Sequence, residues 1–528
     1  MPRRVSVGLA GVLALLGLPA LAQGQSDKRP VVTAAGQVTT DDSPTRAHSA
    51  PQIARNPRNG ELVIVEADPR GDETCAVHIS TDDGRSWFRG GDPMRKPFTD
   101  CTFHAEYGPY AAMAFAEDGT LFVAFVADDP KVPQGSEDAA AEGGPYAPRS
   151  LFLARSSDGG RSFTTATVFR APSDDVDRGL NKGPTLAVQP NDPSRVYVGW
   201  RQGSFSSEQE KLKSVVAASS DGGKTFRAPV DLSGDQGGDY PGLAVDSDGT
   251  LHAVYWSRSF PSLPFGDPKT PLRPIYYRAS TDGGKTFGRR MTLDAGSQDT
   301  KRPPQIAADP DSNVLYVVWD NTPEGRNLAK DFKGDTDIFF LASRDGGKSW
   351  SAKRVLNDDR NTQADQSLPG LSVAPNGRLD VAWYDNRLDV SKGDQPVAQN
   401  VFYTSSSDRG RTFTPNVRIS DRSIDRRIGV FGNNIESTGN VGLASTANAA
   451  YFAWQDSRAG TPRGQAEDVY TAKLAYGQAA VTADGDADAV WVLLGAGAAL
   501  ALGGLLLLAG TRFARRAPPE GVPERAER

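Results

Sequence analysis

The chain has 528 residues, a formal net charge of −6 and 23% charged residues. Its length allows several domains, although one array of repeats can occupy most of it. An acidic chain with no basic run outside its C-terminal tail argues against a nucleic-acid partner. The four histidines show no zinc-binding spacing, so the sequence predicts neither a metal site nor a cofactor. They are His48, His78, His104 and His252.

The first residues of the chain predict export. Two arginines precede an apolar run over residues 5–18, and residues 20–22 supply a small-x-small cleavage site. Residues 1–22 are therefore predicted to be a signal peptide. In an exported chain, Cys75 and Cys101 are expected to form a disulfide, with two buried free thiols as the alternative.

A run of β-strands is predicted to follow. Residues 30–40 carry the valines and threonines of a strand, and a hairpin of two apolar strands then recurs seven times. A proline leads the first six copies, and their turns are rich in Asn, Asp and Gly, as hairpins need. The hairpins cover residues 51–65, 109–125, 184–200, 241–256, 304–319, 369–383 and 441–454.

Each hairpin is followed by a third alternating strand, and in six copies by a turn and a fourth strand. One unit is therefore predicted to be a four-stranded antiparallel sheet. The seventh unit lacks a fourth strand, and residues 31–40 are predicted to supply it, which closes the ring and covers its edges. Six units with an irregular end are the alternative to seven.

The turn between the third and fourth strands carries Ser-x-Asp-x-Gly-x-(Ser/Thr)-(Trp/Phe) at intervals of 61 to 76 residues. Its aspartate can accept hydrogen bonds from the backbone of its own turn, its glycine permits positive φ, and its aromatic ring packs back between layers. We expect a structural role for these six aspartates, which are Asp82, Asp158, Asp221, Asp282, Asp345 and Asp408.

This phrase is the Asp-box, or BNR repeat, and residues 30–476 resemble the sialidase-like family of β-propellers. The resemblance implies an all-β propeller of four-stranded antiparallel blades, which we place at residues 23–476. It also implies that binding sites lie on the rim opposite the Asp-boxes, where the long inserts at 128–149, 257–274 and 321–336 fall.

The C-terminal end predicts a membrane anchor. Residues 477–488 resemble a short flexible stalk. Residues 489–510 contain no charge and are long enough to cross a bilayer, so a transmembrane helix is predicted over 489–511. The arginines that follow place a tail, residues 512–528, in the cytoplasm, and the propeller at the cell surface or in the periplasm. A buried core helix is the alternative.

Two sets of residues map to the rim opposite the Asp-boxes. One follows each second strand, where an Asp–Arg pair could clamp a ligand carboxylate or could staple its own blade. The other precedes each first strand and differs between blades, as either a binding site or a hydrated channel lining would. Together they give the candidate ligand-binding residues Lys182, Arg201, Arg258, Arg302, Asp365, Arg387, Glu436 and Arg458.

Sialidase chemistry requires three arginines that hold the substrate carboxylate, a tyrosine activated by a glutamate, and an aspartate as acid/base. The family's Arg-Ile-Pro stretch is replaced here by Ser-Ala-Pro-Gln-Ile at residues 49–53. Candidates for the remaining roles are Glu106, Tyr107, Asp239 and Tyr240, although no motif places them. The sequence therefore leaves open whether the chain is an enzyme.

The leading functional prediction is a membrane-anchored propeller that binds a glycan or a protein on the rim opposite the Asp-boxes. An exo-acting glycoside hydrolase of sialidase type is the alternative. A scaffold that contacts another membrane protein, without a small ligand, is the third reading.

Overall fold

The computed structural model describes residues 31–41, 43, 46–68, 74–94, 111–128, 149–171, 181–205, 210–257, 273–296, 303–321, 336–359, 364–391, 397–429, 439–461 and 466–476. All of them belong to one compact unit, Arg29–Gly477. The predicted signal peptide, stalk, membrane helix and cytoplasmic tail lie outside the described residues. Within those residues, no helix has the length and apolar character needed to span a membrane.

The described strands form seven antiparallel sheets, which we call blades 1 to 7. Blade 1 contains β4 (Ser49–Arg55), β5 (Leu62–Asp68), β6 (Thr74–Ser80) and β7 (Phe88–Arg89). Blade 2 contains β8 (Ala111–Phe115), β9 (Leu121–Asp128), β10 (Arg149–Ser156) and β11 (Thr164–Phe169). Blade 3 contains β12 (Lys182–Gln189), β13 (Asp192–Phe205), β14 (Glu210–Ser219) and β15 (Val230–Asp231). A 3₁₀ turn, η1 (Gly234–Gln236), leads to blade 4.

Blade 4 contains β16 (Asp239–Val245), β17 (Leu251–Trp256), β18 (Ile275–Ser280) and β19 (Met291–Asp294). Blade 5 contains β20 (Gln305–Ala308), β21 (Leu315–Asn321), β22 (Asp337–Ser343) and β23 (Arg354–Val355). Blade 6 contains β24 (Gln366–Val373), β25 (Leu379–Asp385), β26 (Ala398–Ser406), β27 (Val417–Arg418) and β28 (Ile424–Asp425). Blade 7 contains β29 (Gly442–Thr446), β30 (Ala449–Asp456) and β31 (Ala466–Ala475), joined by β1 (Val31–Val32), β2 (Gly36–Gln37) and β3 (Arg46–Ala47).

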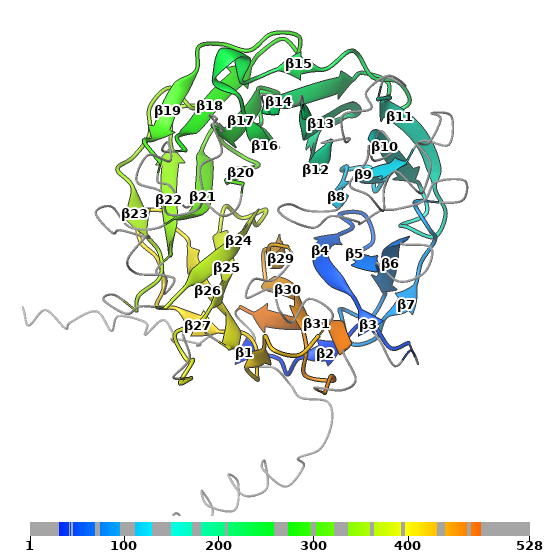
Figure 1. The fold of residues 1–528 in the computed structure, drawn as a ribbon, viewed down its shortest axis with the longest axis vertical. Coiled ribbons are helices and arrows are strands. Elements are labelled where there is room, and N and C mark those ends of the chain that lie inside the picture. Colours follow the sequence, from blue (N-terminus) through cyan, green and yellow to red (C-terminus); the bar gives the residue numbers. More distant parts are fainter. Residues whose placement is uncertain are drawn as a thin grey trace, which may run out of the picture. The chain divides into compact units, whose positions relative to one another are not determined.

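The blades follow one another around a ring, with β4, β8, β12, β16, β20, β24 and β29 toward its centre (Figure 1). The predicted seven blades are therefore confirmed. So is the origin of the missing outer strand, because β1 and β2 pair antiparallel with β31, with Val31 opposite Ala475 and Gly36 opposite Thr471. The N-terminal segment thus joins the last blade, and β3 adds a short parallel pairing with β31.

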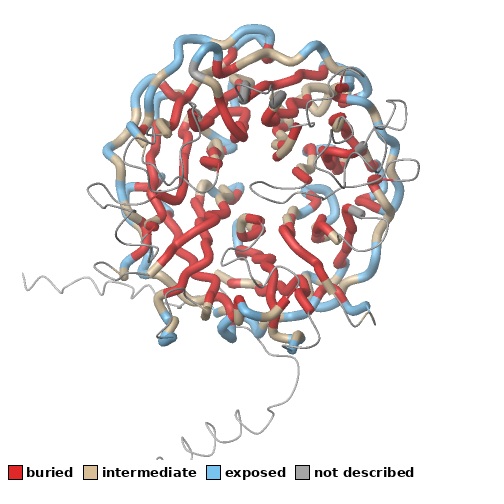
Figure 2. The backbone as a smooth tube through the Cα atoms, viewed as in Figure 1, coloured by how far each residue is buried: buried red, intermediate tan, exposed pale blue. Residues whose placement is uncertain are grey.

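The core lies between the blades, because alternate side chains of a strand point to opposite faces of its sheet. In β5, Val63 and Val65 pack toward blade 2, whereas Leu62 and Ile64 pack toward blade 7. The described residues form seven such apolar clusters, one at each junction between neighbouring blades. Buried positions accordingly run along the sheets, and exposed ones gather at the outer turns (Figure 2).

The six Ser-x-Asp-x-Gly turns share one hydrogen-bond pattern. In the third of them, the Gly223 N–H donates to Ser219 Oγ (2.9 Å) and the Thr225 N–H donates to Asp221 Oδ1 (3.0 Å). The Thr225 hydroxyl donates to Asp221 Oδ2 (2.6 Å), and Gly223 has φ of +75°. Phe226 packs against the cluster between blades 2 and 3. In each turn the aspartate accepts hydrogen bonds from the backbone of its own turn.

Candidate functional site

The antiparallel order of the strands gives every blade two different ends. The loops that join strands 1 and 2, and strands 3 and 4, lie at one end, which we call the turn rim. The loops that join strands 2 and 3, and the residues that enter strand 1, lie at the other end, which we call the polar rim. Those residues predicted to bind a ligand or to act in catalysis that the structure describes belong to the polar rim.

The entries to the inner strands carry a different buried polar group in each of several blades. His48 precedes β4, Asn181 precedes β12, Asp239 begins β16 and Gln366 begins β24, and all four are buried. Each is held by partners of its own: the Trp200 ring N–H, for example, donates to Asn181 Oδ1 (3.2 Å). The unlike groups predicted for this position are therefore present and fixed in place.

A cation–aromatic cluster joins blades 3 and 4. The Arg201 guanidinium donates to Asp239 Oδ1 (3.3 Å) and lies 4.6 Å from the centre of the Tyr240 ring. The other face of the cluster is closed by Gly183, where an added Cβ would lie 2.2 Å from Tyr240 Cδ1. Lys182 is half-buried and is paired with Arg201 across β12 and β13. Tyr240 is 1% exposed, so it packs between blades and does not face a substrate in this structure.

Tyr240 also shares a backbone feature with three other strand entries. Ala50, Tyr240 and Leu368 have φ of +48°, +25° and +59°, and Gly183 has +60°. Each precedes a proline and lies at a register shift in its inner strand. Positive φ is costly for residues with a Cβ, and such strain is often found at functional sites. The polar rim therefore contains recurring strained positions.

A hydrogen-bond network joins blades 5 and 6 at the polar rim. Asp365 Oδ1 accepts from the Thr336 N–H (3.2 Å) and from its hydroxyl (3.0 Å). The Gln366 amide donates to Asp359 Oδ2 (2.9 Å) and accepts from Asn357 (3.1 Å). Asp365 is 9% exposed. Its carboxylate is thus held at the entry to β24 by groups from the neighbouring blade.

Arg387 is held inside the rim by acidic partners. Its guanidinium donates to Asp385 Oδ2 (2.7 Å) and to Asp358 Oδ1 (2.5 Å), and it lies 4.3 Å from the centre of the Phe402 ring. Burial opposes the charge of this guanidinium, but the bonds to Asp385 raise the pKa of Arg387. Burial also raises the pKa of Asp385. The intra-blade staple predicted as one of two alternatives is therefore the arrangement seen here.

Arg458 repeats this arrangement in blade 7. It donates to Asp456 Oδ2 (2.7 Å), pairs with Asp421 (2.7 Å) and lies 4.3 Å from the centre of the Tyr470 ring. The ring N–H of Trp454 donates to the same Asp456 oxygen (3.0 Å). Arg387 and Arg458 thus serve equivalent packing positions in two blades, which is what repetition of the motif predicted.

A chain of charged groups lies where blade 1 meets blade 7. His48 Nδ1 lies 3.0 Å from Glu66 Oε1, and His78 Nε2 lies 3.2 Å from the same oxygen. His48 Nε2 lies 2.7 Å from Asp41 Oδ2. The sequence spacing of the histidines gave no sign of this, because β-sheet pairing brings His48 and His78 to one carboxylate.

Burial and neighbouring charges shift the pKa values of His48 and Glu66 in opposite directions. Burial disfavours the charged imidazole, but the adjacent Glu66 carboxylate and Asp41 raise the pKa of His48 to about 9. Burial likewise disfavours the carboxylate, yet His48 and His78 lower the pKa of Glu66 to about 2. The Glu66 side chain is fully buried, and its Oε2 has no hydrogen-bond partner among the described residues.

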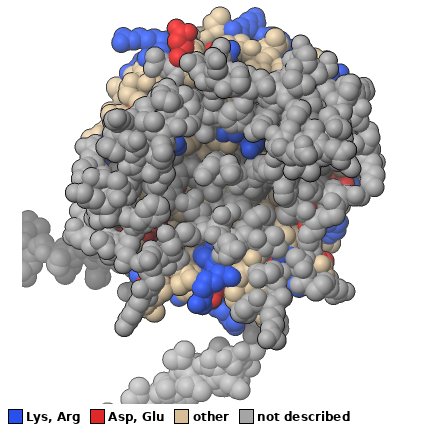
Figure 3. All heavy atoms as spheres, in the orientation of Figure 1, with Lys and Arg blue, Asp and Glu red and all other residues tan. Residues whose placement is uncertain are grey.

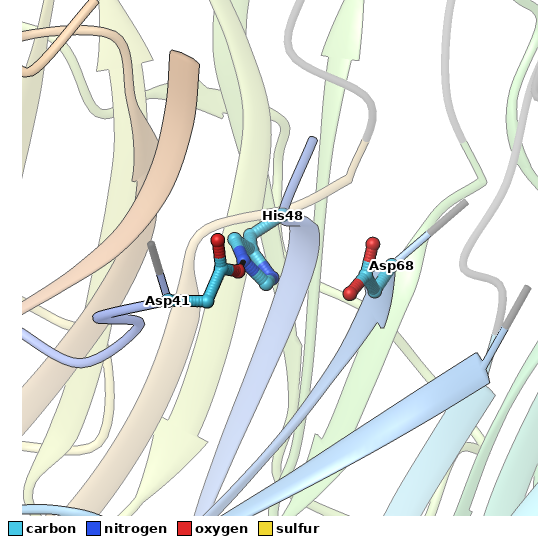
Figure 4. Close-up of side chains that lie close together, drawn as sticks. All are labelled: Asp41, His48 and Asp68. Atoms are coloured by element: carbon cyan, nitrogen blue, oxygen red, sulfur yellow. Dashed lines mark hydrogen bonds and ion pairs between the residues drawn. The ribbon is translucent and has the colours of Figure 1, made fainter. Parts of the chain in front are cut away.

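Figure 4 shows Asp41, His48 and Asp68 close together, with His48 between the two aspartates. One donor atom of each lies within 4.8 Å of the other two. They come from the segment after β2, from the residue before β4 and from the end of β5. The sequence predicted no metal site, and its reasoning missed this group because the three residues form no local motif.

Several predicted site residues lie outside the described residues. They are Glu106, Tyr107, Arg258, Arg302, Glu436 and Cys101. Cys75, in β6, is fully buried and is disulfide-bonded. The structure therefore brings together only part of the predicted set: Lys182, Arg201, Asp239 and Tyr240 at blades 3 and 4, with Asp365, Arg387 and Arg458 in separate networks.

On the face drawn in Figure 3, the described Lys and Arg side chains lie at separate positions and do not form one continuous area. Within the described part of blades 5 and 6, carboxylates predominate around a single guanidinium, that of Arg387. They are those of Asp358, Asp359 and Asp385. This part of the polar rim is therefore acidic.

No protein-family model matches the chain, and no curated protein matches it either. Solved structures do. One is a protein of unknown function from Dyadobacter fermentans, 16% identical, covering 70% of this chain and 98% of that one at a TM-score of 0.45. Another is an α-L-arabinanase from Penicillium chrysogenum, 13% identical, covering 84% and 98% at a TM-score of 0.41.

A third similar structure is the Hadza microbial sialidase Hz136, 14% identical, covering 78% of this chain and 73% of that chain at a TM-score of 0.40. At these identities the likeness is one of fold alone. No residue of this chain takes a role from it.

Proposed function

We propose that this chain is a membrane-anchored propeller, held outside the cytoplasm, that binds an uncharged glycan on its polar rim. The observation that supports binding is the difference between equivalent positions. His48, Asn181 and Gln366 each lie three residues before the proline of their inner strand, yet they are chemically unlike. Positions that serve only folding tend to repeat, as the six turns do, whereas a single ligand needs unlike partners.

The chemistry of the rim favours a hydroxyl-rich ligand. Carboxylate, amide and hydroxyl groups gather at the junction of blades 5 and 6, where Asp365, Gln366 and Thr336 contact one another. Sugar hydroxyls both donate and accept, so they pair with carboxylates and amides alike. The excess of carboxylates around Arg387 opposes an acidic ligand through like-charge repulsion. An uncharged glycan satisfies both conditions.

The same geometry weighs against the sialidase-type hydrolase. A sialic acid carboxylate needs three converging guanidinium groups, and three of the predicted arginines are already engaged with aspartates. Arg201 pairs with Asp239, Arg387 with Asp385 and Arg458 with Asp456. The predicted nucleophile Tyr240 is buried beneath Arg201.

A glycan array tests the proposal. The full-length protein, in detergent micelles, is expected to bind uncharged glycans and not their sialylated forms. Asp365→Asn removes one charge of the rim and keeps an acceptor for Thr336, and it should weaken binding by about tenfold, the loss of one charge-assisted hydrogen bond. Asp221→Asn, on the turn rim, is the matched control and should bind as the wild type does.

Two other outcomes separate the alternatives. Hydrolysis of a fluorogenic sialoside by the full-length protein would replace the binding proposal with the enzyme. Absence of glycan binding, together with specific co-purification of another membrane protein, would support the scaffold. The anchor is tested with sealed right-side-out vesicles: added protease should digest the propeller and spare a tag placed after Arg528.

A further inference from the structure

We propose that Asp41, His48 and Asp68 form a site for a divalent transition-metal ion at the junction of blades 1 and 7. None of its residues belongs to the network around Asp365. It uses two aspartates that the ligand-binding argument leaves without a role, together with His48, and metal binding can be measured without any glycan.

The geometry of the donor atoms carries the proposal. His48 Nε2 lies 2.7 Å from Asp41 Oδ2. One possible ligand atom from each of Asp41, His48 and Asp68 lies within 4.8 Å of the other two. Ligand atoms about 2.0–2.2 Å from a metal are at most about 4.4 Å apart. Side-chain rotations that move these atoms by a few tenths of an ångström therefore suffice to bring all three onto one ion.

The second ring nitrogen of His48 is already held as metal-binding histidines require. Nδ1 lies 3.0 Å from Glu66 Oε1, which fixes the ring and directs Nε2 toward Asp41. A carboxylate behind a metal-bound histidine orients the ring and raises its basicity. Glu66 cannot leave this position, because its side chain is fully buried and His78 holds the same oxygen.

Charge and access favour a cation. Asp41, Asp68 and Glu66 bring three carboxylates to the one imidazole of His48, and Glu66 Oε2 is buried without a hydrogen-bond partner among the described residues. A divalent ion that displaces the proton between His48 and Asp41 would bring more positive charge to these carboxylates than the proton does. The Asp41 side chain is 37% exposed, so solvent reaches the donor group from the rim.

The ligand types indicate the class of metal. One imidazole and two carboxylates suit Mn²⁺, Fe²⁺, Co²⁺ or Zn²⁺, whereas Ca²⁺ and Mg²⁺ prefer oxygen ligands alone. Because three protein ligands leave coordination positions open, solvent or a ligand hydroxyl would complete the shell.

Metal analysis of the full-length protein tests the site. After treatment with EDTA, the protein is dialysed against Mn²⁺, Zn²⁺ or Ca²⁺, and bound metal is counted by mass spectrometry. The wild type should bind about one Mn²⁺ or Zn²⁺ per chain and no Ca²⁺. Asp68→Asn should weaken binding at least tenfold, whereas Asp235→Asn, an exposed carboxylate in η1, should not change it.

Two further measurements separate a built site from an acidic patch. Glu66→Gln keeps an acceptor for His48 without touching the metal, and it should weaken binding by about 10–100-fold, as expected for a group behind a ligand. Pulsed electron paramagnetic resonance of the Mn²⁺ form should show one coupled imidazole nitrogen, which His48→Gln removes.

Asp41→Asn, at a partly exposed position, repeats the ligand test should Asp68→Asn fail to fold. No bound metal in the wild type would overturn the proposal. Equal binding by the wild type and by Asp41→Asn would also overturn it.

Discussion

The two rims of the propeller are built from the same seven sheets but in opposite ways. At the turn rim, one pattern of hydrogen bonds is repeated six times, and within this pattern every contact is made between residues a few positions apart, as between Asp221 and Thr225. At the polar rim, the contacts join residues far apart in sequence, such as Arg46 and Asp468. Local contacts can be copied from blade to blade, whereas the polar rim has to be assembled once for the whole ring.

This difference predicts unequal sensitivity to substitution. The aspartates of the six turns are exposed or half-buried, so water replaces what a substitution there removes. Glu66, at the polar rim, is a buried charge, so separating it from its partners leaves a buried group without compensation. The following experiments test the contrast, beginning with the largest expected effect.

Removal of Glu66 should be the most damaging single change. Glu66→Ala leaves His48 and His78 buried without their shared acceptor, and we expect the free energy of unfolding to fall by about 3–5 kcal/mol. Denaturant unfolding of the full-length protein in the presence of EDTA measures it. Asp235→Ala, at an exposed position, should change it by less than about 0.5 kcal/mol. A loss for Glu66→Ala as small as that would contradict the difference expected between a buried charge and an exposed one.

More of the fold than of the cluster of His48, Glu66 and His78 could be predicted from the sequence. Strand alternation and the proline-led hairpins predict the blades, and the seventh blade's missing strand predicts its N-terminal replacement. Both follow from local patterns. The convergence of His48, His78 and Glu66 depends instead on strand register, since His78 lies opposite Ile64 and Ala67 lies opposite Ser49.

The strand register also explains why the sequence did not reveal the partners of Glu66. Glu66 is the one charged residue among the buried residues 62–67 of β5, and such a residue needs a partner. No rule of sequence spacing identifies that partner. A bulge at Ala50 shifts the pairing of β4 with β5, and this shift cannot be read from one sequence.

A pair of glycines tests close packing at the polar rim. Gly183 and Gly234 have nearly equal φ, +60° and +56°, but an added Cβ meets the Tyr240 ring at Gly183 and no atom within 4 Å at Gly234. Gly234→Ala should cost about 1 kcal/mol, for backbone strain alone. Gly183→Ala should cost about 1–3 kcal/mol more, because the Tyr240 ring has to move.

Thermal and denaturant unfolding of the two alanine variants supply the comparison. Equal losses would show that Tyr240 is free to move, and Gly183 would then be no more tightly packed than the exposed Gly234.

The losses in unfolding free energy caused by substitutions at two turns should be additive. Asp221→Asn and Asp345→Asn each remove the charge of one turn, and each should lower the free energy of unfolding by about 1 kcal/mol, because the lost hydrogen bonds are largely exposed. The two turns belong to different blades and share no partner, so the double variant should equal the sum within about 0.5 kcal/mol. Non-additivity beyond this would mean that the turns are coupled around the ring.

The smallest expected effect is the pH dependence of one turn. The Thr225 hydroxyl and backbone N–H, with Ser219, hold the pKa of Asp221 at about 2, below its ordinary value of 3.8. A lowered pKa in the folded state means that the stabilisation is present above pH 3.8 and is lost as the pH falls through about 2. Asp221→Asn carries no charge at any pH, so it resembles the protonated turn. The difference in Tm between the wild type and this variant should therefore be constant from pH 7 to 5 and should close toward pH 2. A difference in Tm that persists at pH 2 would show that the turn is stabilised by the shape of the Asp221 side chain and not by its charge. Electrostatic attraction would then contribute little to the stability of the turn rim.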